Sequence, residues 1–144
     1  MTMPAPVLPS ALRPGDTIAV VAPSGWVSRT RLTVGVEMLE SWGFRVRVLP
    51  GVHESRGYLA GASDEANAAE LSAAFSDPSV DGIICARGGY GAMRLLPFVD
   101  WDAIRAHPKF FCGYSDITAL HLAIRREAGL VTFHGSMRPR RPEA

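Results

Sequence analysis

Ser115 is the residue whose type and surroundings point most directly to chemistry. It stands in FFCGYSDITAL (110–120), where an apolar run typical of a strand passes at once into a sequence with helical spacing. A serine before a helix is most often an N-cap, because its side-chain oxygen satisfies backbone N–H groups that the first turn leaves unpaired. The same pattern describes a nucleophile elbow, in which a sharp turn lifts a serine above the sheet edge. Both interpretations stay open at this point.

Two neighbours of Ser115 favour the elbow. Gly113 suits a sharp turn, since crowding there disfavours a side chain. Asp116 opens the helix, so its backbone N–H would lie beside any oxyanion formed at the serine. The match to a hydrolase elbow is incomplete, because Ile117 stands where G-x-S-x-G requires its second glycine.

The glycine-rich stretch RGGYG (87–91) is a second candidate for chemistry. Such stretches are often simple flexible turns. A dinucleotide-binding loop is a poor match, because Arg94 replaces the third glycine and the loop follows the third predicted strand, not the first. The functional interpretation is that bare backbone here admits a substrate and supplies a second oxyanion donor. Acyl transfer needs a nucleophile and two N–H donors around one carbonyl, so the two loops together are stronger evidence than either alone.

A general base is not evident among the four histidines. His53 lies in a predicted loop, His107 precedes a proline, and His121 falls near the apolar stripe of a predicted helix, where we expect a partly buried packing role. His134 ends the fifth predicted strand and is placed to line the same rim as Ser115. No carboxylate partner is evident for any of them, so the sequence does not supply a Ser–His–acid triad, and it contains no zinc-ligand spacing.

The elements that must position these residues alternate along the chain. Apolar runs predict five strands, and periodic segments predict four helices. The strands are expected at 17–23, 44–49, 80–86, 109–114 and 131–135, and the helices at 28–43, 63–77, 90–99 and 116–129. Alternating strands and helices predict an α/β fold with an open, mainly parallel sheet covered by helices on both faces.

Ligands of such sheets gather at the carboxyl ends of the strands. That rule selects the four loops 23–25, 87–91, 114–116 and 134–136. Ser24 and Arg87 lie near this predicted rim as candidate substrate contacts, although a turn residue and a surface charge are equally good descriptions of them.

Size and composition limit the remaining possibilities. The chain has 144 residues and a net charge of +1, which predicts one compact domain and gives no sign of a nucleic acid or an anionic membrane as partner. We expect a proline-rich extended lead-in at 1–16, a folded domain at 17–137, and a linker or truncated end at 138–144.

Cellular location is predicted only indirectly. Cys85 and Cys112 lie in apolar runs and are predicted to be buried free thiols, which indicates a reducing compartment. The first residues lack the pattern of a secretory signal, and the apolar runs are too short to span a bilayer. A cytoplasmic location is therefore expected.

Several motifs occurring in one order resemble a known family. The runs LRPGDTIAVVAPSG, ARGGYGAMRLLPFVDWDAI, KFFCGYSDITALHLAI and TFHGSM, spread over about residues 12–137, resemble the N-terminal half of the LD-carboxypeptidases, serine peptidases of the muramoyltetrapeptide carboxypeptidase type. The resemblance implies a flavodoxin-like three-layer α/β domain followed by a separate C-terminal domain. It also implies removal of a terminal D-alanine from murein tetrapeptides in cytoplasmic peptidoglycan recycling, while some relatives cleave peptide–nucleotide antibiotics for self-immunity.

The same resemblance assigns roles to residues. The serine of G-[YF]-S-D, here Ser115, is the family's nucleophile, and the backbone N–H groups of Asp116 and Gly89 are the oxyanion donors. Position at the predicted rim, and not the resemblance, leads us to expect substrate contacts from Arg87, Gly88, Tyr90, Ser24 and His134. No metal or organic cofactor is implied, the partner is a small peptide, and a homodimer is common in the family.

Two departures from the family pattern matter. Ser136 replaces the proline of HGP. The resemblance places the family's catalytic Glu and His in a C-terminal domain that would follow residue 144, so we expect this chain to be nearly inactive alone. A non-catalytic small-ligand-binding module and a non-functional fragment are the competing hypotheses.

Overall fold

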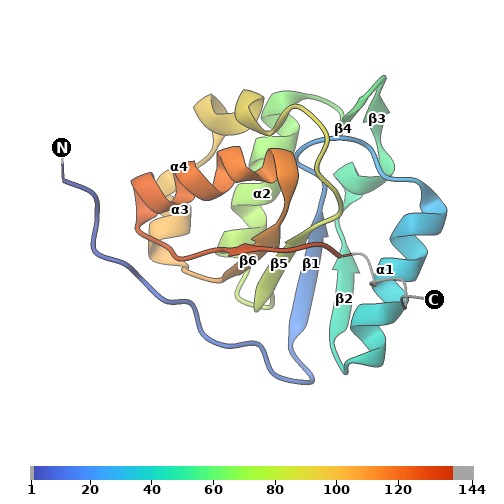
Figure 1. Cartoon of the computed structure of the whole chain (residues 1–144), viewed down its shortest axis with the longest axis horizontal. Coiled ribbons are helices and arrows are strands. Elements are labelled where there is room, and N and C mark those ends of the chain that lie inside the picture. The colour runs from blue at the N-terminus through green and yellow to red at the C-terminus, as the bar shows by residue number, and fades with distance from the viewer. Residues whose placement is uncertain (1, 138–144) are drawn as a thin grey trace.

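The computed structural model describes residues 2–137 and contains one five-stranded parallel sheet (Figure 1). Its strands lie in the order β2-β1-β5-β6-β7, and every neighbouring pair is parallel. The bounds are β1 (Thr17–Val21), β2 (Arg45–Val48), β5 (Gly82–Cys85), β6 (Phe110–Gly113) and β7 (Phe133–His134). Counted without the small hairpin β3 (Ser55–Arg56) and β4 (Leu59–Ala60), this is the flavodoxin-like order 2-1-3-4-5. The predicted fold class is confirmed.

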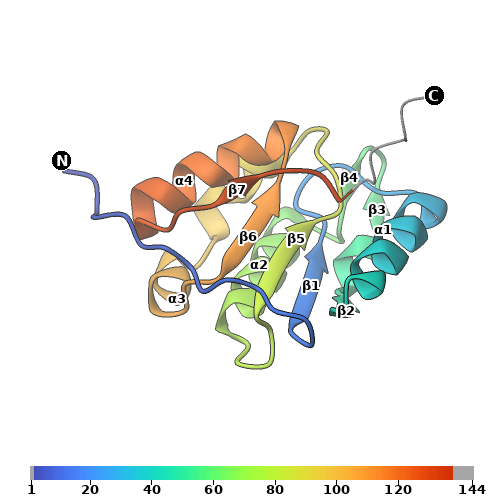
Figure 2. The same ribbon diagram turned by 60° about the horizontal axis from the view of Figure 1, so that its bottom comes forward.

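Helices cover both faces of this sheet, as Figures 1 and 2 show. One face carries α2 (Asp64–Ser76), α3 (Trp101–Ala106) and α4 (Thr118–Ala128), and the other carries α1 (Arg29–Ser41). Three short 3-10 helices connect the larger elements: η1 (Pro50–His53), η2 (Ala92–Phe98) and η3 (Ser115–Ile117). Within residues 2–137 no helix combines the length and apolarity needed to cross a membrane.

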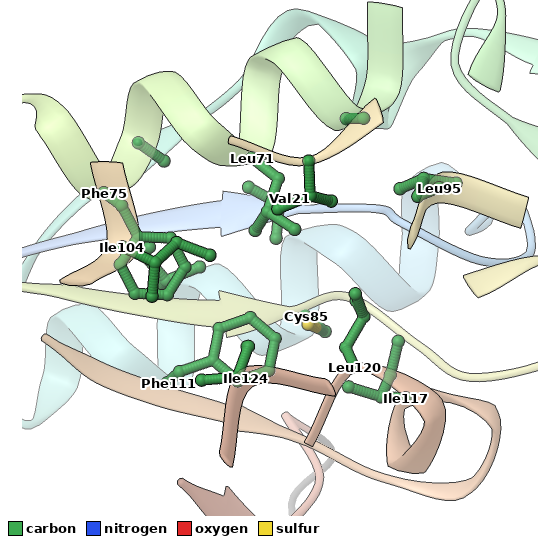
Figure 3. Close-up of a cluster of buried hydrophobic side chains, with 14 of the residues drawn as sticks. Val21, Leu71, Phe75, Cys85, Leu95, Ile104, Phe111, Ile117, Leu120 and Ile124 are labelled. Atoms are coloured by element: carbon green, nitrogen blue, oxygen red, sulfur yellow. The ribbon is translucent and has the colours of Figure 1, made fainter. Parts of the chain in front are cut away.

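Two apolar cores lie on opposite faces of the sheet, and the alternation of β1 divides its residues between them. Ala19 and Val21 join the larger core under α2, α3 and α4 (Figure 3), whereas Ile18 and Val20 join the smaller core beside α1. Covering on both faces explains why this strand reads as a continuous apolar run. The larger core contains Phe111 of β6, whose ring stacks on Phe75 at a centroid distance of 5.9 Å. The packing of Phe111 therefore anchors β6, the strand that leads to Ser115.

The lead-in before β1 is tied to the domain by backbone hydrogen bonds and apolar packing. Val7 donates its N–H to the carbonyl of Gly129 and accepts the N–H of Val131, each at 2.9 Å. Leu12 packs against the smaller core. The first residues thus pair with the connection between α4 and β7.

The five strands of the sheet all fall inside the predicted ranges, and so do α1, α2 and α4. The predicted helix at 90–99 is instead the 3-10 helix η2, with Pro97 inside it; proline lacks the N–H that an α-helical ladder needs. The sequence interpretation missed α3, which Asp100 caps by accepting the N–H of Ala103, and it missed the β3–β4 hairpin. Cys85 is buried as expected, but Cys112 is only half-buried. The segment predicted as a linker, 138–144, lies outside the described residues.

Candidate active site

Ser115 occupies a strained backbone position at the end of β6. Its φ is 57°, and it is the only non-glycine residue of the described segment 2–137 with a positive φ. An L-residue in this conformation costs roughly 1–2 kcal/mol, and such strain concentrates at functional sites. The following helices, η3 and α4, begin without a side-chain cap. The capping interpretation therefore does not hold, and the backbone has the form of an elbow.

Gly113 permits this turn because the helix folds back closely over the strand. A Cβ built on Gly113 would lie 2.6 Å from Cγ2 of Ile117, which is fully buried. The same contact explains why isoleucine at 117 is compatible with the turn, although it departs from the hydrolase pattern. Its side chain fills the core beneath the elbow.

The glycine loop packs directly against the elbow at Gly88. A Cβ built on Gly88 would lie 2.9 Å from both Cβ of Ser115 and the carbonyl oxygen of Tyr114, and 3.3 Å from the nitrogen of Asp116. A Cβ on Gly89 would instead meet the Tyr58 hydroxyl at 3.0 Å and the backbone of Gly25. Gly88 is thus the glycine that touches the serine, a distinction that the sequence did not provide.

The two N–H groups expected to bind an oxyanion are oriented by the carbonyls that precede them. The carbonyl of Gly88 accepts the N–H of Gly25 at 3.1 Å, and the carbonyl of Ser115 accepts the N–H of Thr118. In a trans peptide the N–H points opposite to the C=O. The N–H of Gly89 therefore points away from the Gly25 loop, and the N–H of Asp116 points away from the body of the helix.

The carboxylate of Asp116 joins three strand-end loops. Its Oδ2 accepts the hydroxyl of Ser24 at 2.6 Å and the backbone N–H of Ala92 at 2.9 Å. Ser24 is only 1% exposed, so its position favours a supporting role over a direct substrate contact. The sequence placed these loops on one rim but contained no sign of this carboxylate network.

Arg87 lies at the rim with its guanidinium held in place. Nη1 donates to the carbonyl of Trp26 at 3.1 Å, Nη2 lies 3.5 Å from the Tyr58 hydroxyl, and Cζ stands 5.7 Å from the centre of the Tyr58 ring. No carboxylate within residues 2–137 forms an ion pair with this arginine. Tyr90, the aromatic residue of the glycine loop, is 53% exposed.

Two histidines lie at the elbow. Nε2 of His134 accepts the backbone N–H of Ser115 at 3.2 Å. His121 lies below the turn, with Nε2 2.9 Å from the carbonyl of Gly113 and Nδ1 2.7 Å from the Thr132 hydroxyl. Its ring meets Phe111 edge-on, which matches the predicted packing role. Burial lowers the pKa of His121, against the opposing effect of its bond to Gly113.

The other histidines do not join the elbow. His53 is in η1 and His107 ends α3. In the part of the chain that the structure describes, no group of three or more His, Cys, Asp or Glu side chains is arranged to hold a metal ion.

Comparisons with known proteins agree with this fold. The sequence profile of the LD-carboxypeptidase N-terminal domain matches residues 18–135. A putative carboxypeptidase of Streptomyces coelicolor is 50% identical over 135 residues, which cover 91% of this chain and 43% of the relative. A probable murein peptide carboxypeptidase of Bacillus subtilis is 44% identical over 129 residues, which cover 90% of this chain and 40% of the relative.

The same fold occurs in a solved structure of the microcin self-immunity protein MccF, known from Escherichia coli. The two chains superpose with a TM-score of 0.83 at 34% identity, over 88% of this chain and 38% of that one. This chain therefore spans about two-fifths of the length of the relatives it matches.

Proposed function

Because this chain belongs to the LD-carboxypeptidase family, we propose that it is the nucleophile-bearing part of a serine carboxypeptidase acting on murein tetrapeptide. The bond cut is the L,D-peptide bond to the terminal D-alanine, in cytoplasmic peptidoglycan recycling. The observation that carries the proposal is the strained backbone of Ser115, φ 57°, with Gly88 packed against it. Strain of this kind at a residue other than glycine is concentrated at functional sites.

The proposed reaction proceeds through an acyl-enzyme. The Ser115 hydroxyl attacks the carbonyl carbon of the scissile bond and loses its proton to a base. The carbonyl oxygen becomes an oxyanion, which the N–H groups of Asp116 and Gly89 stabilise; one such donor is worth roughly 2.7–4 kcal/mol in the transition state. As the intermediate collapses, the C–N bond breaks and the base returns its proton to the departing nitrogen of D-alanine. Water then attacks the ester, giving one proton back to the serine oxygen and leaving the acid product.

The base is proposed to come from outside this segment. His134 directs its Nε2 at a backbone N–H and His121 directs both nitrogens at other partners, so neither is arranged to take the hydroxyl proton. The resemblance places the catalytic Glu and His in the family's C-terminal domain. We therefore expect this chain alone to be nearly inactive.

Substrate contacts are proposed for the side chains and backbone that line the rim. Arg87 is a suitable partner for the free carboxylate that a carboxypeptidase must recognise, because its guanidinium is fixed by Trp26 and Tyr58 but forms no ion pair within residues 2–137. Gly88 and Gly89 let a peptide approach the backbone, and the exposed ring of Tyr90 offers an apolar surface beside them.

The direct test is hydrolysis of murein tetrapeptide by this chain and by a longer version that extends over the length its relatives have. We expect D-alanine release by the longer version, almost none by the chain alone, and none from the longer version with Ser115→Ala. Undiminished release by that variant would refute the assignment of Ser115.

A second candidate substrate is a peptide–nucleotide, because MccF is a self-immunity protein of the same fold and 34% identity. Parallel assays of murein tetrapeptide and an aminoacyl-sulfamoyl adenosine distinguish the two. A non-catalytic binding module would instead be favoured if neither substrate is hydrolysed and if a nucleotide or flavin binds equally well to the Ser115→Ala and Gly89→Ala variants.

A further inference from the structure

His134 lies where it bears on the nucleophile without touching the hydroxyl. It is the second residue of β7, and Gly113 is its partner in the parallel pairing of β6 and β7. The N–H of Gly135 donates to the carbonyl of Gly113 at 3.0 Å, which fixes the register. Backbone pairing thus brings the imidazole to the elbow, where Nε2 lies 3.2 Å from the nitrogen of Ser115.

The direction of this hydrogen bond indicates the tautomer of the neutral His134 ring. A backbone N–H is only a donor, so Nε2 must carry a lone pair, and the proton of the neutral ring is on Nδ1. That lone pair is already used by the backbone and is not available to a serine hydroxyl. His134 is therefore poorly placed as a general base and well placed to hold the main chain.

His121 has the opposite tautomer. The carbonyl of Gly113 is only an acceptor, so Nε2 of His121 donates to it, and Nδ1 accepts the Thr132 hydroxyl. The two rings lie 6.0 Å apart. One imidazole accepts from the N–H of Ser115 and the other donates to the carbonyl two residues earlier.

We propose that His134 is a positioning residue of the active site, which stabilises the left-handed backbone of Ser115 by accepting its N–H, with His121 fixing the strand end below. The proposal rests on the proposed peptidase function for its catalytic consequence, but not for the hydrogen bond itself. The backbone conformation of Ser115 decides where its hydroxyl points, so loosening this N–H lowers the fraction of molecules with the hydroxyl in the cleft.

The catalytic test compares three substitutions in the longer version that has peptidase activity. We expect His134→Leu to lower kcat about tenfold with little change in KM, because positioning affects the transition state more than binding. His134→Gln should restore most of the rate, since its amide oxygen can take the place of Nε2 as acceptor. His107→Leu, at the end of α3, is the matched control and should leave the rate unchanged.

A spectroscopic test uses this chain alone and needs no activity. Nitrogen-15 NMR should show a proton on Nδ1 of His134 and on Nε2 of His121. The amide proton of Ser115 should shift in His134→Leu and stay close to its original position in His134→Gln. Loss of peptidase activity from every version would refute the proposed function but leave this result intact. A proton on Nε2 of His134, or an unmoved Ser115 amide in His134→Leu, would overturn the positioning role even in an active enzyme.

Discussion

Asp116 accepts the hydroxyl of Ser24 at 2.6 Å, although the two residues are 92 positions apart in the chain. Ser24 follows β1 and Asp116 follows β6, so this one contact ties the first strand-end loop to the elbow. The adjacent N–H of Ala92 on the same carboxylate oxygen adds the glycine loop. The carboxylate of Asp116 thus holds three strand-end loops of the rim together.

Ser24→Ala tests the energetic weight of this network. It leaves a part-buried carboxylate with one donor fewer, and hydrogen bonds to charged groups contribute about 1.5–3 kcal/mol. We expect a loss of about 1–2 kcal/mol in the free energy of unfolding, measured by urea titration. Ser76→Ala, at the exposed end of α2, should change stability by less than about 0.5 kcal/mol. Equal losses in the free energy of unfolding for the two variants would show that the Asp116 network contributes little to stability.

Gly88→Ala should both destabilise the protein and disturb the elbow. The added Cβ would lie 2.9 Å from Ser115 Cβ and from the Tyr114 carbonyl, and relief of such overpacking typically costs about 1–3 kcal/mol. Gly57→Ala is a useful control, since its Cβ meets open space and only the positive φ of 61° opposes it. Thermal unfolding of both variants checks the stability, and the Ser115 amide resonance reports the elbow. The expectation fails if Gly88→Ala leaves that resonance in place.

The strain at Ser115 predicts an unusual order of stability among its variants. Glycine tolerates a φ of 57° and alanine does not, while glycine costs more chain entropy on folding. Relief of the backbone strain should exceed the added entropy cost, so Ser115→Gly should be more stable than Ser115→Ala by about 1 kcal/mol in denaturant titration. Both variants lack the hydroxyl, so both should be inactive. A less stable glycine variant would mean that the backbone at this position is relaxed.

His121 should contribute to the loss of stability at acid pH. Burial lowers its pKa in the folded protein, so the unfolded chain binds the proton more readily. Its contribution is present above the unfolded pKa of about 6.5 and is lost as the pH falls toward the lower folded value. Unfolding free energies between pH 7.5 and 5 should therefore fall less steeply in His121→Gln than in the parent. His53→Gln, an exposed change in η1, should keep the parental slope, and a parental slope in His121→Gln would contradict the prediction.

Both cysteines should resist thiol reagents while the protein is folded. Burial raises the pKa of the Cys112 thiol and raises that of Cys85 further, and the thiolate is the reactive form. A disulfide reagent at pH 8 should react slowly with native protein, Cys112 before the fully buried Cys85, and rapidly with both after denaturation. Two fast thiols in the native protein would show that the sheet opens readily in solution.

Most strands and helices were predictable because the apolar pattern of each segment reflects which of its faces are buried. The run TIAVVAP lacks alternation since both its faces are covered, and Ser63 caps α2 as the pattern indicated, by accepting the N–H of Ala66. The incorrect and missed elements are those whose conformation depends on packing between distant parts of the chain. Pro97 lies inside a segment whose spacing is helical, and α3 has only 6 residues, too few for a periodic pattern.

The sequence predicted which loops meet at the candidate site, but it did not predict which residues contact one another there. Topology alone brought residues 24, 88 and 115 to one rim, because parallel strands end together. Which glycine touches Ser115, and which partner each histidine has, depends on the register of β5, β6 and β7. No local signal in the sequence determines that register.

The bridge from Val7 to Leu130 and Val131 has a consequence for the timing of folding. A chain emerging from the ribosome presents its lead-in first, yet the partner of that lead-in is made more than a hundred residues later. Four strands of the sheet and helices α1 to α4 precede this segment in the chain, so they are synthesised before it. Thr132 and His134 arrive in the same late segment, so His121 and Ser115 gain these partners only after α4 has been synthesised. A nascent chain would thus carry the nucleophile before the backbone N–H of Ser115 has His134 as its partner.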